Sequence, residues 1–234
     1  MAKKKKKDSA AESIQTVEQA LSKTEVFIER NQNIIVYSFI AIMIIVGAFY
    51  GYRKYVKLPK ERRAQEDMFF AERYFEKDSL DLALMGDGNN LGFLDIIDEY
   101  GRTSSANLAR FYAGTIYLKK GAFEDAIDML EDFNGKDDIV GPIGIGRLAD
   151  AYLEVGEVKK AAKKYLEAAE KRDNPLTTPM FLFRAGVTYE KLLEDPNRAL
   201  ELYNRIRRDY PKSNEARSIE KYIARAELAA GIDE

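Results

Sequence analysis

The residue types that most often carry out chemistry in proteins are scarce in this sequence. Its 234 residues include no Cys, no His and no Trp. The chain therefore has no thiol nucleophile, and it lacks the commonest general base and metal ligand. Carboxylates, Ser, Lys and Tyr remain, but no acidic pair stands apart from solvated helix faces, since Glu190 and Glu194 simply lie one turn apart. We therefore predict that the protein is not an enzyme, with no catalytic residue, no cofactor and no small-molecule substrate.

One stretch offers oxygen ligands of the kind that calcium prefers. A Gly-Asp-Gly-Asn-Asn run at residues 86–90 contains Asp87 and Asn89 and is followed by Asp95 and Asp98. These four side chains are the candidate oxygen ligands. An EF-hand loop requires an oxygen ligand at its fifth place and a bidentate Glu at its twelfth. Here Leu91 and Asp98 occupy those places. We therefore predict a Gly- and Asn-rich connection between helices and no metal site.

The charges divide the chain into three blocks that the net charge of −2 conceals. Residues 1–33 carry seven basic and five acidic residues, residues 53–64 carry six basic residues and Glu61, and the remainder carries 24 basic and 33 acidic residues. Nucleic-acid binding needs a basic face that neutralises phosphates. The acidic remainder argues against a nucleic-acid partner, and the run Lys3–Lys7 is interpreted as a basic tail.

A run of 19 uncharged residues, Ile34–Tyr52, predicts a single transmembrane helix. It would be about 28 Å long, close to the thickness of the hydrocarbon core of a bilayer. Ten of its residues are Ile, Val or Phe, which favour insertion. No small-residue cleavage site follows, which indicates an uncleaved anchor. Gly47 and Gly51 have the spacing that allows close packing of membrane helices, although such glycines also occur in unpaired spans.

The charges beside this run leave its orientation open. The C-terminal flank, a predicted basic juxtamembrane linker at 53–64, is the more basic side, which favours a cytoplasmic location for that side. The run Lys3–Lys7 would have to cross the membrane in that case. Large C-terminal domains also cross largely regardless of charge. Sequence physics alone does not decide between the two orientations.

The leader, residues 1–33, contains one apolar stripe with helical spacing. The stripe predicts a short amphipathic helix that would lie on the membrane surface, pair with a partner helix or be a weak solvated helix. Its members are Ile14, Val17, Leu21, Thr24 and Ile28.

The rest of the chain, residues 65–234, has the periodicity of helices and repeats itself. A pattern small-x2-Tyr-x3-turn-x4-Ala begins at Gly114, at Ala149 and, with one extra residue, at Gly186. A period near 34 with this pattern resembles the tetratricopeptide repeat (TPR). We expect the small residues to let the two helices of each hairpin approach closely, and Gly121 and Gly156 to form left-handed turns between them.

We therefore predict an all-α fold in which a transmembrane helix precedes a TPR α-solenoid. The solenoid has one degenerate and three clear repeats, with Gly92 at the small position of the degenerate one, and a terminal helix with Ile219, Ile223 and Ala226 on its buried face. The predicted boundaries are 65–104, 107–140, 142–173 and 179–211 for the repeats and 213–230 for the terminal helix.

In TPR arrays the first helix of each hairpin lines the groove. Arrays that capture carboxylate termini present basic residues where this chain has Phe111, Gly146 and Phe183. An apolar groove with scattered charge instead favours extended or partly unfolded segments. The alternative is that both Phe rings are buried by neighbouring helices. The predicted groove residues are Phe111, Thr115, Leu118, Lys119, Arg147, Asp150, Glu154, Phe183, Val187 and Lys191.

One span near the N-terminus, a basic flank and three to four C-terminal TPR units together resemble the bacterial ancillary SecYEG translocon subunit (YfgM-like) family. The resemblance implies a single-pass protein of the bacterial inner membrane with a cytoplasmic N-terminus and periplasmic repeats. It also implies association with the SecYEG translocon, periplasmic chaperones and exported clients. It would place the basic flank 53–64 near anionic lipid headgroups. The alternative is a cytoplasm-facing adaptor of another inner-membrane complex.

Overall fold

The structure, a computed structural model, describes residues 2–232, with side chains described for residue 26 and residues 28–232. Every regular element in this range is a helix and none is a strand, so the predicted all-α fold is confirmed. The chain divides into two compact units, Met1–Pro59 and Lys60–Glu234.

The first unit consists almost entirely of the helix α1 (Ala2–Tyr52). Large apolar side chains of its described part are exposed: Ile34 and Phe39 are each 65% exposed and Tyr37 is 70% exposed. This part of the chain is long and apolar enough to cross a membrane, and none of its most apolar window is buried. In the leader stripe, the side chains of Ile14 to Thr24 lie outside the described residues, and Ile28 is exposed.

Helical structure continues beyond α1 through the basic stretch. The π-helical turn η1 (Arg53–Lys57) is followed by α2 (Leu58–Glu76). The N–H of Leu58 donates to the carbonyl of Arg53, five residues back, which is the hydrogen bond of a π-helix. Pro59, which has no N–H to donate to the preceding turn, is the second residue of α2. Residues predicted as a linker at 53–64 are thus helical.

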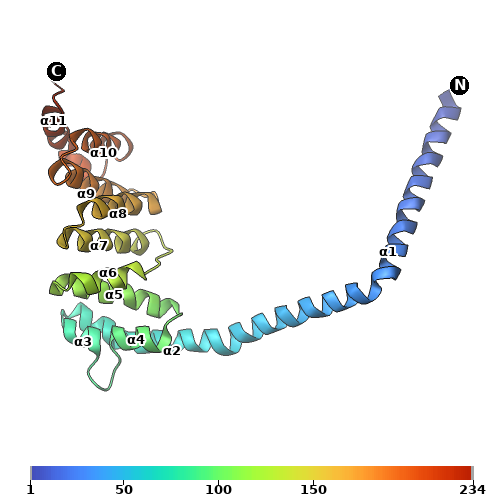
Figure 1. The fold of residues 1–234 in the computed structure, drawn as a ribbon, viewed down its shortest axis with the longest axis horizontal. Helices are drawn as coiled ribbons and strands as arrows, with labels where there is room; N and C mark the ends of the chain where they lie inside the picture. Colours follow the sequence, from blue (N-terminus) through green and yellow to red (C-terminus); the bar gives the residue numbers. More distant parts are fainter. Residues whose placement is uncertain (1, 233–234) are drawn as a thin grey trace. The chain divides into compact units, whose positions relative to one another are not determined.

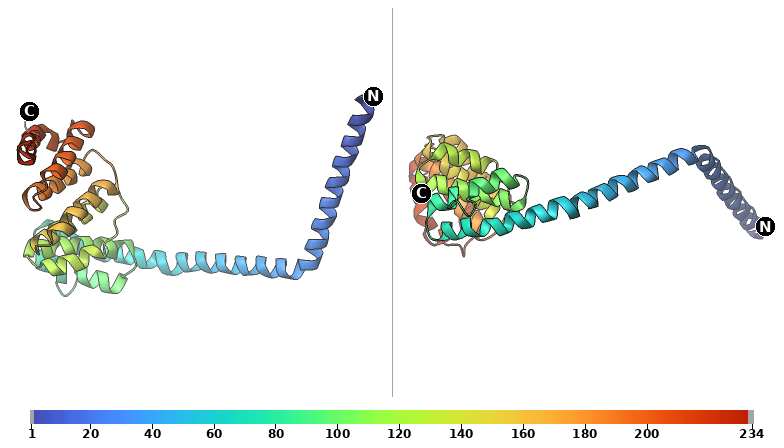
Figure 2. Two further views of the ribbon diagram at one scale, coloured as in Figure 1. Left: turned by 45° about the horizontal axis from the view of Figure 1, so that its top comes forward. Right: turned by 90° about the horizontal axis from the view of Figure 1, so that it is seen from below.

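The second unit is a stack of helical hairpins in chain order (Figures 1 and 2). Each of the three clear repeats forms one hairpin whose helices pack side by side, and each is joined to the next by a short loop. The hairpins are α5 (Ser104–Lys120) with α6 (Phe123–Glu131), α7 (Val140–Glu154) with α8 (Val158–Lys171), and α9 (Thr177–Lys191) with α10 (Pro196–Asp209).

Small residues bring the helices of a hairpin together as predicted. A Cβ on Gly114 would lie 2.5 Å from Cγ of Leu130, and one on Gly186 would lie 2.4 Å from Cε1 of Tyr203. Gly121 and Gly156 have φ values of +76° and +80°, which confirms the predicted left-handed turns. Ala126, Ala161 and Ala199 are completely buried.

The degenerate first repeat differs from its prediction. A short helix that was not predicted, α3 (Leu80–Met85), precedes the Gly- and Asn-rich connection and buries Ala83 and Leu84. The next helix, α4 (Phe93–Tyr100), begins only after Gly92. Gly92 is therefore not a crossing point within a helix. It lies against the chain at the end of α3, where a Cβ would come within 2.4 Å of the carbonyl oxygen of Leu84.

The terminal helix covers the last hydrophobic edge of the stack. It begins later than predicted, because a 3₁₀ turn η2 (Glu215–Ser218) precedes α11 (Ile219–Ala230). Ile219, Ile223 and Ala226 are buried, which confirms the predicted inner face.

Candidate protein-binding groove

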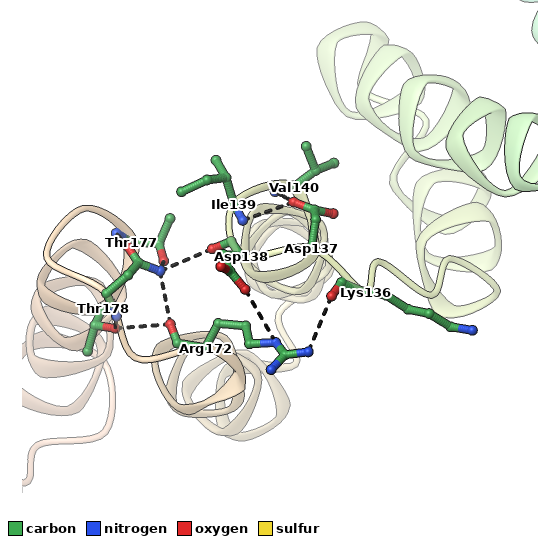
Figure 3. Close-up of polar contacts among 9 residues, drawn as sticks. Lys136, Asp137, Asp138, Ile139, Val140, Arg172, Thr177 and Thr178 are labelled. Atoms are coloured by element: carbon green, nitrogen blue, oxygen red, sulfur yellow. Dashed lines mark hydrogen bonds and ion pairs between the residues drawn. The ribbon is translucent and has the colours of Figure 1, made fainter.

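Hydrogen bonds in the loops before α7 and α9 define the start of these two helices (Figure 3). Oδ1 of Asp137 accepts hydrogen bonds from the N–H groups of Ile139 and Val140, at 2.9 and 2.5 Å. Oδ1 of Asn174 likewise accepts from the N–H groups of Leu176 and Thr177, at 2.9 and 2.8 Å. A side chain of this type satisfies N–H groups that a helix start leaves unpaired. Each loop therefore defines where its helix begins.

The same two loops are bonded to each other. Nδ2 of Asn174 donates to the carbonyl of Asp138 at 3.1 Å. Nη2 of Arg172 donates to the carbonyl of Lys136 at 3.4 Å, and its Nε lies 3.5 Å from the Asp138 carboxylate. Figure 3 shows these contacts joining consecutive repeats. They hold α7 and α9 in a fixed relation and so preorganise the surface between them.

The predicted groove residues of α5 do not form an open surface. Thr115 is buried and its hydroxyl donates to the carbonyl of Phe111, so the expectation that Thr115 is exposed is wrong. Phe111 and Leu118 are half-buried and pack on the core between α5 and α7, and the Phe111 ring lies 5.4 Å from that of Phe133. Lys119 is exposed and pairs with Asp78 at 3.0 Å.

Of the predicted groove residues on α7 and α9, two residues of α9 share one surface hollow. Phe183 and Val187 line a depression with a volume of about 260 Å³ that opens to solvent between α7, α8 and α9. Its other lining residues are Leu153, Tyr165, Arg184, Thr188 and Leu192. We call this surface the α7–α9 depression. The sequence did not point to Leu153 or Leu192, because they come from different helices, and Leu192 follows the end of α9.

Phe183 lines the depression and also packs on the core. The two alternatives predicted for it, a groove residue and a ring covered by neighbouring helices, therefore both apply. Its ring packs edge to face on Tyr222 of α11, with 4.7 Å between centroids. Leu192 is 55% exposed, and Val187 and Leu153 are half-buried. The floor of the α7–α9 depression is thus apolar and only partly covered by the protein.

Asp150, a predicted groove residue, is bonded to Tyr165 and Arg184, both of which line the depression. Tyr165 donates its hydroxyl to Oδ1 of Asp150 at 2.5 Å, and Nη1 of Arg184 donates to the same oxygen at 2.6 Å. Burial and this hydrogen bond raise the pKa of Tyr165 well above its usual value, so the phenol stays protonated. The other side of Arg184 borders the depression. Arg147 lies 3.6 Å from Asp150, and Glu154 is exposed.

A second carboxylate, near the end of α9, is also bonded within the protein. Glu190, whose side chain is 3% exposed, accepts hydrogen bonds from the hydroxyl of Tyr203 and from Nε and Nη2 of Arg225, and lies 3.2 Å from Lys191. Burial opposes ionisation of Glu190, but the hydrogen bonds from Arg225, Tyr203 and Lys191 outweigh it and lower the pKa of the carboxyl. Lys191, a predicted groove residue, is half exposed and immediately precedes Leu192, which lines the depression.

The side-chain oxygens near residue 87 accept hydrogen bonds from neighbouring groups of the protein. Oδ1 of Asp87 accepts from the N–H groups of Asn89 and Asn90, while its Oδ2 accepts from the hydroxyl of Tyr74. Asp95 accepts from the N–H of Gly92. The hydrogen bond from Tyr74, reinforced by Asn90, lowers the pKa of Asp87. Among the described residues, no group of three or more Asp or Glu side chains could hold a metal ion.

Comparisons with known proteins agree with this architecture. A tetratricopeptide repeat family model matches residues 181–213, which span most of α9 and all of α10. The solved TPR-like repeats of a protein described as a putative kinesin light chain from Podosopora anserina are similar, with a TM-score of 0.54 and 15% identity over 72% of this chain and 87% of that chain. A single-substitution variant of the same repeats matches equally. None of the curated proteins matches the sequence.

The chain therefore carries a TPR-like helical solenoid preceded by one long apolar helix. At 15% identity the likeness to the solved repeats establishes the fold alone. TPR-like repeats are typical of protein-interaction scaffolds.

Proposed function

We propose that the protein is a membrane-tethered interaction module that binds other polypeptides and does not transform them. The observation that carries the proposal is the α7–α9 depression, which has an apolar floor and is open to solvent. Extended segments bind such surfaces by placing an apolar side chain in the hollow while charged rim residues fix its orientation.

Arg184 lines the depression, Lys191 immediately precedes the lining residue Leu192, and each is paired with a carboxylate of the protein. Asp150 and Glu190 are each satisfied by a Tyr and an Arg of the protein. Arg184 and Lys191 are thereby held in place while remaining 42% and 51% exposed. Preorganised groups lose little conformational entropy on binding. We therefore propose a ligand segment in which an apolar residue follows or precedes a carboxylate.

The apolar helix of the first unit supplies the tether in this proposal. Its side chains from Ile34 to Tyr52 are exposed apart from Gly51, which is half-buried, and no charge interrupts them. In a bilayer every backbone group of such a helix is satisfied within the helix. Tethering raises the local concentration of a weak groove near clients at the same membrane.

The finer proposal is an ancillary subunit of the Sec translocon in a bacterial inner membrane. It is supported by the layout of one span, a basic flank and C-terminal repeats, which resembles that of the YfgM-like family. In this version the N-terminus is cytoplasmic, the repeats are periplasmic, and the partners are the translocon, periplasmic chaperones and exported clients. The second candidate is a cytoplasm-facing adaptor, which the strongly basic C-terminal flank favours.

Site-specific photo-crosslinking in intact membranes tests the interaction. A crosslinker at Val187 or Leu192 should give adducts with other polypeptides, identified by mass spectrometry. The matched control is Asp128, which is exposed on α6. Identical adducts from both faces, or none from Val187, would reject the groove. The absence of any translocon component would reject the finer proposal only.

A protease-protection assay on spheroplasts separates the two orientations. Digestion of the solenoid by added protease is expected for periplasmic repeats. Protection of the solenoid until the membrane is lysed would favour the cytoplasm-facing adaptor.

A further inference from the structure

The outer face of α2 carries two exposed aromatic rings. Phe69 is 51% exposed and Phe70 is 43% exposed, and their centroids lie 5.4 Å apart in an edge-to-face arrangement. The opposite side of the helix already packs in the core through Ala64, Met68 and Ala71. Packing within the solenoid therefore does not explain the two rings.

The charges of α2 are sorted by face. Glu61 turns inward, where its carboxylate accepts hydrogen bonds from the N–H groups of Ser104 and Ser105 at 2.7 and 2.9 Å. Asp67 also turns inward and accepts the hydroxyl of Tyr100. With these acids turned inward, the outward charges are mainly basic. The exposed charged residues of α2 are Lys60, Arg62, Arg63, Glu66, Arg73 and Glu76.

Arginine and phenylalanine are also interleaved on this face. The guanidinium of Arg73 lies 5.7 Å from the centroid of the Phe69 ring, and Arg62 pairs with Glu66 at 2.9 Å. Outward, four basic residues face two acidic ones, although residues 65–234 as a whole carry an excess of acid. Exposed Phe rings among basic residues are typical of helices that lie in the interface of an anionic membrane.

We propose that the face of α2 formed by Arg62, Arg63, Phe69, Phe70 and Arg73 docks on the surface of anionic phospholipids. The rings would enter the boundary between headgroups and acyl chains, while the guanidinium groups contact lipid phosphates. The proposal rests on the membrane placement of Ile34–Tyr52 in the proposed function. Arg62 follows Tyr52 by ten residues, so the tether keeps this face close to lipid.

The chain between the apolar helix and this face contains two interruptions of α-helical bonding. One is the π-helical hydrogen bond from Leu58 to Arg53, and the other is Pro59, which has no N–H. Helices change direction at such features. The docking requires a change of direction, because a straight helix along the membrane normal would carry Phe69 about 25 Å away from Tyr52.

Charge argues for lipid rather than for a second copy of the chain. A symmetric dimer through the rings would bring the same face of both copies together. This face carries four basic and two acidic exposed residues, so two copies of it would repel each other through their excess of basic residues. Phosphates of lipid headgroups instead complement them.

Fluorescence quenching in reconstituted vesicles tests the docking with the full chain. Because the sequence has no Cys, single labels at Gln65→Cys, Ile40→Cys and Asp128→Cys report on α2, on the apolar helix and on α6. The vesicles contain phosphatidylcholine with or without phosphatidylglycerol, and brominated lipids serve as quenchers. We expect quenching at Gln65→Cys in the anionic vesicles, quenching at Ile40→Cys in both, and none at Asp128→Cys.

Two further variants keep the test decisive. Arg62→Gln together with Arg63→Gln should lower the ratio of docked to undocked α2 by about 30-fold, from about 1 kcal/mol per basic residue, with an unchanged melting temperature. Quenching at Ile40→Cys without quenching at Gln65→Cys would overturn the docking alone. Energy transfer between labels on two copies, without quenching at Gln65→Cys, would replace lipid by a second copy. No quenching at Ile40→Cys would overturn the tether of the proposed function as well.

Discussion

The two units of this protein treat apolar side chains in opposite ways. In α1, Ile34, Ile44 and Ile45 are between 65% and 67% exposed. In the solenoid, Ile96, Ile116 and Ile206 are completely buried. The same residue type thus packs on protein in one unit and has no protein partner in the other. Because exposed apolar surface of this extent is unfavourable in water, the first unit needs a cover that the second does not.

Glycines show the same contrast. A Cβ on Gly47 or Gly51 would meet nothing within 4 Å, whereas one on Gly146 would lie 2.0 Å from Cε1 of Phe181. In the solenoid a missing side chain is what allows two helices to touch. In α1 no such contact exists within the unit, so pairing through Gly47 and Gly51 stays a prediction about a partner.

The largest expected effect comes from placing the same charge in both units. Leu182→Lys puts an ammonium group at a completely buried position and should cost at least about 4 kcal/mol of the solenoid's unfolding free energy. Ile40→Lys alters a side chain that is 47% exposed and should leave that free energy unchanged. Thermal unfolding followed by circular dichroism in detergent measures both. Equal destabilisation would contradict the division into two units.

Acid should weaken the solenoid more than α1. The folded pKa of Glu190 is lowered, so its ion pairs contribute stability above the unfolded pKa of about 4.3 and lose it as the pH falls through the lower folded value. Glu190→Gln should cost about 1.5–3 kcal/mol at pH 7. The variant should also flatten the loss of stability as the pH falls below about 5. An unaltered pH profile of the melting temperature would refute the role of this carboxylate.

A single added methyl group sharpens the glycine contrast. Gly186→Ala would drive a Cβ into Tyr203, which is completely buried and bonded to Glu190. We expect a loss of about 1–3 kcal/mol, or about 2–4 °C of melting temperature per kcal/mol in a domain of this size. Gly47→Ala is the matched control and should not lower the melting temperature of the solenoid. A loss in both variants would contradict the packing described.

The smallest effect on folding is expected in the α7–α9 depression. Val187→Asp changes a half-buried wall residue and should alter the unfolding free energy by less than about 1 kcal/mol. It should weaken partner binding by about tenfold or more if the wall contacts an apolar side chain. The control is Leu228→Asp on α11, a position that is 74% exposed. The measurement is the affinity of both variants for a partner recovered by crosslinking. An equal loss of affinity in both variants would exclude a specific site.

The turns and helix crossings of the solenoid were predictable because each depends on a few residues that are close together in the sequence. Gly121 and Gly156 indicate left-handed turns, and Ala126, Ala161 and Ala199 indicate helix crossings. The helix α3 was not predicted, because the Gly- and Asn-rich residues that follow it resemble a loop. Its burial of Leu84 depends on contacts with distant helices, which override local propensity.

The candidate site was predictable only in part. Helical spacing identifies Phe183 and Val187, which share one helix face. Leu153 and Tyr165 join them from α7 and α8, and no spacing within one helix reveals that meeting. The prediction for Thr115 was wrong because a position on the inner side of the first helix can still be covered by neighbouring side chains. The spacing of residues within a helix predicts on which side of the helix each one lies, whereas the exposure of a side chain depends on the packing of the whole stack.

The central claim is that a bilayer covers the apolar helix and thereby holds the solenoid at a membrane. Alkaline carbonate extraction of membranes from cells that produce the full chain, followed by high-speed sedimentation, tests it directly. The account predicts that the protein remains in the pellet with the lipid, as an integral membrane protein does. Recovery of the intact chain in the supernatant would contradict it.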